Sequence, residues 1–447
     1  MTELEKAGLP TVAIAARGFE NDFEASALTF GLAQIPYVVI PHTLTSRNRQ
    51  EAARDVDGVF DRLAMALVTQ PQQPARAAAG TVRAAERETF KGGDRFESWE
   101  QFNHDFLERG LGDGFPLLPP TPELVEAFVK AVRREPLEVV GHLAPVYGVA
   151  TVERLAINAA MAGCQPADFP ILIAAVEAIT ETPQNVFPIR TIAMSTGPHA
   201  MMLLVNGPIV KQLGINSGRC TLGPGKPGKV NTALGRALRL ILMNVGHSYP
   251  GEGDMDTIGT PLKYSMCLAE NEDENPWEPF HVERGFRREQ STVTVFGTVD
   301  IIHNANYQRS ADQLLLGWAG RASTPGSHNT PFPSRQEFDV DHFTMLMCPD
   351  HARNLKQDGH SKQSIREFMA THSRTPLKFV LASSLTSLDA MPSSAQWLLR
   401  MDPEPLLPAI PQPELVHIVV VGGPTGKSDL VRNLGGPTIT KAVETAN

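Results

Sequence analysis

The stretch NSGRCTLGPGKPGK, at residues 216–229, places one cysteine among four glycines and three cationic side chains. Backbone N–H groups at such a turn, when a helix follows, can hold an anion against the helix dipole. The cations around Cys220 favour its thiolate and therefore its reactivity. The stretch predicts an anion-binding loop with a nucleophilic thiol, and a solvated basic loop is the alternative. The predicted anion-binding residues of this loop are Arg219, Gly223, Gly225, Lys226 and Gly228.

The glycines of this loop also fit the G-x-G-x-x-G spacing of dinucleotide-binding turns. Two features disfavour that interpretation. Pro224 and Pro227 remove two N–H donors from the turn, and no clean strand leads directly into it. A small anion or a carboxylate therefore suits the loop better than a dinucleotide does.

Two further cysteines lie in settings that chemistry could use. Cys164 precedes the helix of PADFPILIAAVEA, and a helix N-terminus would lower the pKa of its thiol. Cys267 precedes a run of carboxylates that begins at Glu270 and could supply a general base. Those carboxylates could also share a divalent ion with Asp254 and Asp256. Interior packing is the alternative for Cys164, and a solvated acidic face is the alternative for the run.

The segment CPDHARNL places Cys348, Asp350 and His351 at the end of a predicted strand. Ligands of parallel α/β sheets gather at the carboxyl ends of the strands. The same argument makes His303 and His42 candidates, because each follows an apolar run. A single C-x-x-H is insufficient for zinc without a second pair of ligands. The pattern predicts an acid–base or ligand role for His351.

The segment VVVGGPTGKSDL is similar to a phosphate-binding P-loop, but its spacing is one residue short of that pattern. ATP hydrolysis is therefore disfavoured. An anion held by Lys427, Ser428 and the loop amides is the remaining interpretation. The chain contains no convincing nucleotide, flavin or zinc motif, so its cofactor requirement stays open.

The elements that must position these residues alternate between strands and helices. PTVAIAA and IPYVVIPH read as strands near the start, and residues 47–70 read as one amphipathic helix. Later strands are predicted in HAMMLLVNGP, STVTVFGTVDIIHN, HFTMLMCPDH and HIVVVGGPTGKS. The pattern predicts an α/β fold with mixed or parallel sheets flanked by helices.

Composition divides the chain into four predicted segments. Residues 1–70 form a small βαβα half-domain, and residues 71–95 form a linker rich in Pro, Gln, Ala and Gly. Residues 96–290 form an α/β core with the glycine-rich loop and the acidic run. Residues 291–447 form a C-terminal α/β segment that packs on this core.

Charge and cysteine content exclude several classes of protein. The formal net charge of −9, from 40 basic and 49 acidic residues, disfavours nucleic-acid binding. No apolar run reaches the length of a membrane span, and the start lacks a signal-peptide pattern. Four cysteines without a C-x-x-C motif indicate reduced thiols. These features predict a cytoplasmic protein.

The G-x-P-T-V strand start, the VVIPH strand exit at His42 and the long charged helix that follows resemble a known family. The first seventy residues resemble the C-terminal half of the UGSC family, bacterial proteins named for a selenocysteine-or-cysteine, Gly, Ser, Cys motif. That motif is absent here, so the redox chemistry suspected for the family transfers to no residue of this chain. A half-domain exposes strand edges, so the resemblance implies a partner subunit that carries the other half. Segments such as GDGFP, INAAMAGC and LGINSG resemble an uncharacterised bacterial family found with such proteins.

These patterns together favour an enzyme that acts on a small anionic metabolite. A lyase or hydrolase-type step is favoured over hydride transfer, with a cysteine thiolate or a Glu/His pair as the chemical group. The predicted catalytic residues are Cys220, Cys164, Cys267, Glu270 and His351. The alternatives are a thiol-redox protein or subunit of a UGSC-type complex, and a non-catalytic partner subunit. An oligomer is expected in each case.

Overall fold

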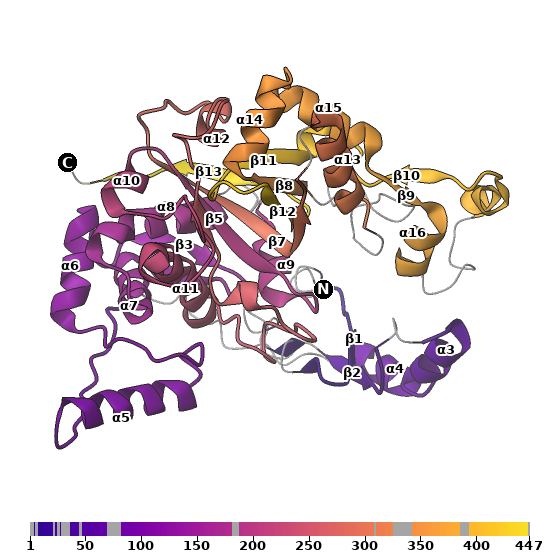
Figure 1. Ribbon diagram of the computed structural model, residues 1–447. Helices are drawn as coiled ribbons and strands as arrows, with labels where there is room; N and C mark the ends of the chain where they lie inside the picture. Colours follow the sequence, from indigo (N-terminus) through magenta and orange to yellow (C-terminus); the bar gives the residue numbers. More distant parts are fainter. Residues whose placement is uncertain are drawn as a thin grey trace.

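The computed structural model describes residues 4, 8–20, 23–24, 27, 36–43, 47–68, 82–180, 187–307, 310–324, 342–384 and 393–445. Helices and strands are mixed throughout this part of the chain, which confirms the predicted α/β class (Figure 1). None of its helices combines the length and apolarity that a bilayer span needs.

The N-terminal unit contains a two-stranded parallel sheet of β1 (Ala13–Ala16) and β2 (Tyr37–Ile40). The helix predicted over residues 47–70 forms as two helices, α3 (Arg49–Asp57) and α4 (Phe60–Val68), because the chain turns at Gly58. Figure 1 shows this unit apart from the large sheet. The first helix of the predicted βαβα half-domain, in the segment between β1 and β2, lies mostly outside the described residues.

The core of the N-terminal unit is small. One cluster of buried side chains contains Val38, Ile40 and Val59, and Ala16 and Leu63 pack beside them. Phe60 and Met65 on α4 remain 63% and 65% exposed. A two-stranded sheet with so few buried side chains has little stability of its own.

A helical layer follows, and its ends obey local rules that the sequence displays. Thr121 caps α6 (Pro122–Val132) with proline at the first helical position, and Gly163 ends α7 (Val152–Ala162) in the left-handed region. A hairpin of β3 (Val139–Leu143) and β4 (Gly148–Thr151) lies between these helices in the chain. The layer also contains α5 (Arg95–Glu108), α8 (Phe169–Thr180) and α11 (Lys229–Asn244).

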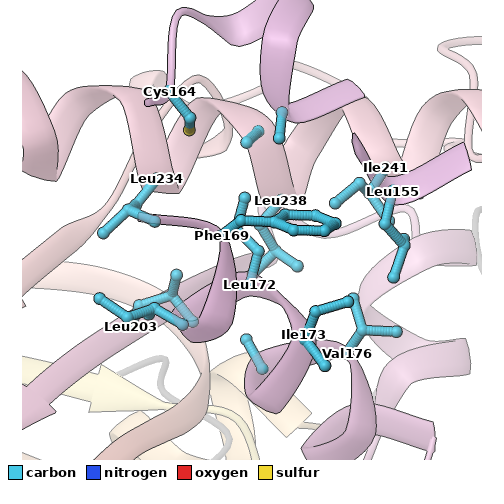
Figure 2. Close-up of a cluster of buried hydrophobic side chains, with 14 of the residues drawn as sticks. Leu155, Cys164, Phe169, Leu172, Ile173, Val176, Leu203, Leu234, Leu238 and Ile241 are labelled. Carbon is cyan, nitrogen blue, oxygen red and sulfur yellow. The ribbon is translucent and has the colours of Figure 1, made fainter. Parts of the chain in front are cut away.

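The main core lies between this helical layer and the large sheet. Figure 2 shows apolar side chains of α7, α8 and α11 gathered around Phe169. Phe169 is fully buried and meets Phe128 of α6 edge-to-face, with ring centroids 5.4 Å apart. Such an aromatic pair adds about 0.5–1.5 kcal/mol beyond the burial of its area.

Seven strands form the large sheet, in the order β11-β8-β12-β7-β5-β6, and β13 pairs with β7. Parallel and antiparallel neighbours are both present, so the sheet is mixed. The sheet is continuous across the predicted boundary at residue 290. Its strands are β5 (Ala200–Asn206), β6 (Cys267–Ala269), β7 (Thr292–Ala305), β8 (His342–Met347), β11 (Val416–Val420), β12 (Lys427–Asn433) and β13 (Ile439–Ala442).

The sheet curls so that its two end strands approach each other. One face forms a single apolar cluster to which six strands contribute, including Met202 of β5 and Val419 of β11. The other face divides into two clusters, one under α7, α8 and α11 and one under α13–α15. Directly after β6, Asn271 donates its N–H to the carbonyl oxygen of Val420 on β11, at 2.8 Å. The loops that follow β6 and β11, the two end strands of the sheet, are therefore neighbours.

Smaller elements complete the described part of the chain. They are α9 (Ile189–Met194), α10 (Ile209–Leu213), α12 (Phe280–Glu283), α13 (Ala311–Ala322), α14 (Pro349–Gln357), α15 (Lys362–His372), β9 (Arg374–Pro376), α16 (Leu377–Ser384) and β10 (Leu406–Pro408).

Candidate functional site

Three loops that the sequence singled out meet beyond the carboxyl ends of β8 and β11. Gly422 donates its N–H to the Ser217 carbonyl at 2.8 Å and accepts a bond from the Asn271 side chain at 3.2 Å. The Arg219 side chain packs against Gly423 so closely that a Cβ atom there would overlap it. The curl of the sheet thus joins the glycine-rich loop, the acidic run and the GGPTGKS segment.

Cys348, His351 and Ser428 form a buried polar cluster at this edge. Cys348 is the residue before α14, and proline occupies the first position of that helix. Ser428 is the second residue of β12, and its Oγ lies 2.7 Å from Nδ1 of His351. The same oxygen accepts the backbone N–H of Cys348 at 2.9 Å. The residues are 3%, 1% and 4% exposed, respectively.

The cluster lowers the pKa of the Cys348 thiol to about 7. Burial by itself would raise this pKa, but hydrogen bonds from His351 and Ser428 to the sulfur outweigh it. The position before α14 adds the positive end of a helix dipole. The pKa of His351 is raised, because the effect of Cys348 and of the Asn306 carbonyl exceeds that of burial. The arrangement therefore favours a thiolate–imidazolium pair.

The loop over this cluster is strained. Thr425 has φ of 128°, a backbone conformation that a β-branched residue rarely adopts. Its N–H donates to Oδ2 of Asp350 at 2.7 Å. Burial by itself would raise the pKa of Asp350, but this bond and the charge of Arg353 outweigh burial and lower it. Arg353 also pairs with Glu274 of the acidic run, at 3.0 Å. Asp350 thus ties the strained loop to the first turn of α14.

Cys164 and Cys267 lie in the apolar core rather than at this edge. Both are buried in the cluster under α7, α8 and α11, and Figure 2 shows Cys164 among its side chains. Burial, followed by the charge of Asp168, raises the pKa of both thiols. The lowered pKa expected for Cys164 from the following helix is not found, because desolvation dominates.

Cys220 is exposed and takes a left-handed conformation with φ of 55°. Its carbonyl accepts the N–H of Gly223 at 2.7 Å, and the N–H of Gly228 bonds Gly225 O at 3.1 Å. Two amides of the predicted anion cradle are thus used inside the loop. Lys226, like Arg219 and Lys427, is exposed at the surface.

Glu270 directly follows β6 and is fully buried. Its carboxylate accepts bonds from Asn206 Nδ2 at 2.5 Å, from Asn275 Nδ2 at 2.7 Å and from the Phe280 N–H at 2.7 Å. Burial nevertheless raises its pKa to about 7. These bonds fix the start and end of the loop 270–280 around one carboxyl group.

The carboxylates proposed to share an ion with Glu270 are paired elsewhere. Asp254 accepts from Arg239 at 3.0 Å and from Lys263 at 2.8 Å, and Asp256 pairs with Lys263 at 2.7 Å. Within the described residues, no group of three or more His, Cys, Asp or Glu side chains is placed to hold a metal ion.

The two other histidines predicted at strand ends lie in ordinary surface pairs, and His303 lies inside β7. His303 Nδ1 lies 2.7 Å from Asp429, and His42 Nδ1 lies 3.2 Å from Asp55. Both imidazole rings are exposed, in contrast to that of His351.

Sequence reasoning named His351 and Ser428 but left Cys348 out of the predicted catalytic set. The available signal was the spacing of Cys348 and His351, which face the same side of a helical turn. The contribution of the Asn306 carbonyl, 2.8 Å from Nε2 of His351, has no sequence signal, because any residue type supplies a carbonyl.

The comparisons with known proteins concern only the N-terminal unit. Residues 2–69 match the model of the UGSC family, in agreement with the resemblance seen in the sequence. The comparison with curated proteins gives no match, and neither does the comparison with solved structures. The Cys348 cluster lies outside the matched residues.

Proposed function

We propose that this protein is an enzyme that uses Cys348 as a nucleophile and His351 as its acid–base partner. The observation that carries this proposal is the buried Cys348–His351–Ser428 cluster, in which a thiol at a helix start has a pKa of about 7. A nucleophilic cysteine needs a nearby base and a lowered pKa. We thus place the thiol role at Cys348 rather than at Cys220, Cys164 or Cys267.

A hydrolase-type step suits this pair best. The thiolate attacks a carbonyl carbon and forms a covalent acyl intermediate, while the imidazolium gives its proton to the leaving group. Water then attacks the thioester, and the imidazole takes the water's proton before the thiol is released. The helix start supplies backbone dipoles that favour negative charge next to the sulfur.

The substrate is proposed to be a small anion. Arg219 lies against Gly423, and Lys427 follows the same loop, so two exposed cations lie on the loops next to the cluster. Cys348 is only 3% exposed, so we propose that the loop 421–426, which is bonded to Asp350 and lies beside His351, moves to admit a substrate. Strain at Thr425 lowers the cost of that movement.

The test is an activity screen of the full chain with small aryl esters and thioesters, each in a carboxylate-bearing and a neutral form. Cys348→Ala is expected to lower kcat/KM by about 100-fold or more, and His351→Gln by a similar factor. Cys220→Ser is the matched control, because its thiol is exposed and outside the cluster, and it should stay within about twofold. Full activity of Cys348→Ala, or loss in Cys220→Ser, would refute the assignment.

A partner-subunit function is the second candidate, and the N-terminal unit favours it. Its two strands carry few buried side chains, and apolar residues of α4 are exposed. A subunit that completes this sheet would cover them. Co-expression with a chain carrying the UGSC motif tests this, and a stable complex with activity absent from either chain alone would support it. Monomeric behaviour of both chains in size-exclusion chromatography would oppose it.

A further inference from the structure

Ser428, the serine of the GGPTGKS segment, contacts both members of the Cys348–His351 pair. We propose that Ser428 is a positioning residue whose hydroxyl bridges the thiol of Cys348 and the imidazole of His351. This inference rests on the proposed function and adds to it the tautomer of the histidine and the path of the proton.

The tautomer follows from the group that faces Nε2. That nitrogen lies 2.8 Å from the Asn306 carbonyl oxygen, which can only accept a hydrogen bond. Nε2 therefore carries a hydrogen whether the ring is neutral or charged. Nδ1 is the nitrogen that gains and loses the proton, and it lies 2.7 Å from the Ser428 hydroxyl.

The hydrogen-bonding capacity of the Ser428 hydroxyl matches its surroundings. With the imidazole neutral, the hydroxyl donates to Nδ1 of His351. One lone pair accepts the backbone N–H of Cys348 at 2.9 Å, and the other is free to accept the thiol S–H. In the ionised state, His351 and Ser428 favour the Cys348 thiolate and lower the pKa of the thiol against the effect of burial. The hydroxyl can thus make one donor and two acceptor contacts.

Ionisation of the pair moves two protons and conserves charge. The thiol proton passes to Oγ of Ser428 while the hydroxyl proton passes to Nδ1 of His351. The products are a thiolate, a neutral hydroxyl and an imidazolium ion. The hydroxyl then donates to the thiolate and accepts from Nδ1–H. Because Ser428 is 4% exposed, solvent water does not substitute for it in the closed cluster.

This placement gives the P-loop-like segment a different role from phosphate binding. The side chain of Ser428 faces inward from the start of β12, and Asp350 already occupies the Thr425 N–H. The serine and the loop amide serve the protein's own side chains.

The experiment measures the rate of Cys348 alkylation by iodoacetamide from pH 5 to 10, read by peptide mass spectrometry on the full chain. Ser428→Ala should move the midpoint upward by about one pH unit, because a hydrogen bond to the thiolate is lost. Ser428→Thr keeps the hydroxyl and should restore the midpoint towards that of the unmodified protein.

Thr344→Val is the matched control for simple loss of a buried hydroxyl. Thr344 lies on β8 and donates to Asn433 at 2.6 Å, away from the sulfur. The Thr344→Val substitution should lower the Tm about as much as Ser428→Ala does, and it should leave the alkylation midpoint of Cys348 unchanged. An unchanged midpoint in Ser428→Ala would overturn the proposal and leave Ser428 a structural role alone.

A measurement on the unmodified protein covers the case in which Ser428→Ala does not fold. Nitrogen-15 NMR of labelled histidine, assigned with His351→Gln, should show the Nε2–H tautomer for neutral His351. The Nδ1–H tautomer would overturn the proposal. The alkylation and NMR measurements need no substrate. Activity of Cys348→Ala would refute the proposed enzymatic function, whereas the alkylation midpoint and the tautomer test only the bridging role of Ser428.

Discussion

The core beneath α7, α8 and α11 and the strand-end cluster at α14 both bury cysteine thiols, with opposite results. In the core, the sulfur atoms of Cys164 and Cys267 have apolar neighbours and the charge of Asp168, and their pKa values rise. At the strand end, the sulfur of Cys348 has His351 and Ser428, and its pKa falls to about 7. Burial opposes the charged form in both places, so the hydrogen-bonding partners decide the outcome.

The comparison teaches that a buried thiol is reactive when its surroundings stabilise the anion more than burial destabilises it. It also separates two settings of cysteine in one chain. Cys164 and Cys267 are packed in the apolar core, as small apolar residues are. Cys348 lies at a helix start beside an imidazole and a hydroxyl, the groups on which the proposed nucleophilic role depends.

The largest expected effect is a difference in native labelling between these two regions. At pH 7.5 and with a small alkylating reagent, Cys348 should react at least about 100-fold faster than Cys164 or Cys267, because only its thiolate is populated. Quantitative peptide mass spectrometry of the folded protein measures the ratio. Comparable rates for the three cysteines would break the comparison.

Labelling of the unfolded protein is the control for this comparison. In a denaturant all three thiols should react at similar rates, since their partners and their burial are lost together. Differences that persist after unfolding would assign the contrast to local sequence instead of tertiary structure.

The next effect concerns Glu270, whose pKa is raised by burial, as the pKa values of the core thiols are. Its pKa in the folded protein is about 7, above the ordinary 4.5, so the neutral form is favoured by folding. The resulting stability is present below pH 4.5 and is lost as pH rises to 7, by about 3 kcal/mol in total. Glu270→Gln should remove this dependence, and urea unfolding at several pH values would measure it.

The matched comparison for Glu270→Gln is Asp256→Asn, at a carboxylate whose partners dominate. Lys263 and backbone N–H groups outweigh burial and lower the pKa of Asp256. That variant should lose stability at neutral pH instead of flattening the profile between pH 4.5 and 7. Identical profiles of stability against pH for the two variants would contradict the conclusion that burial dominates at Glu270 and that charged and hydrogen-bonding partners dominate at Asp256.

The smallest expected effect is that of Cys267→Ala. Removal of one buried sulfur leaves a small cavity and should lower the free energy of unfolding by about 1 kcal/mol. Ester or thioester turnover should stay unchanged, in contrast to Cys348→Ala. Urea denaturation and the activity screen measure the two quantities, and a loss of turnover without a loss of stability would return Cys267 to the catalytic set.

The sequence determined most of the local structure. Thr121 with Pro122 and the left-handed glycine at residue 163 mark helix ends where the structure has them, because caps depend on neighbouring residues alone. The apolar runs in HAMMLLVNGP and HFTMLMCPDH became β5 and β8. The sequence also placed His351 at a strand end, where functional groups gather.

Other features of the fold were beyond local patterns. The segment GGPTGKS reads as a phosphate loop, yet Lys427 and Ser428 begin β12, which inserts between β7 and β8. The pairing of β12 with β8 joins residues that are more than eighty positions apart in the chain. Gly58 divides a helix that periodicity predicts as continuous.

Only the tertiary structure decided which cysteine has a nucleophile's environment. Local charge pointed to Cys220, whose neighbours in sequence are cationic, but the backbone N–H of Cys348 meets the hydroxyl of a serine eighty residues later in the chain. A pKa depends on burial and on partners in space, and both follow from strand order and from the curl of the sheet. The sequence determined the residue types and the ends of many elements, and the folded sheet determined which side chains face one another.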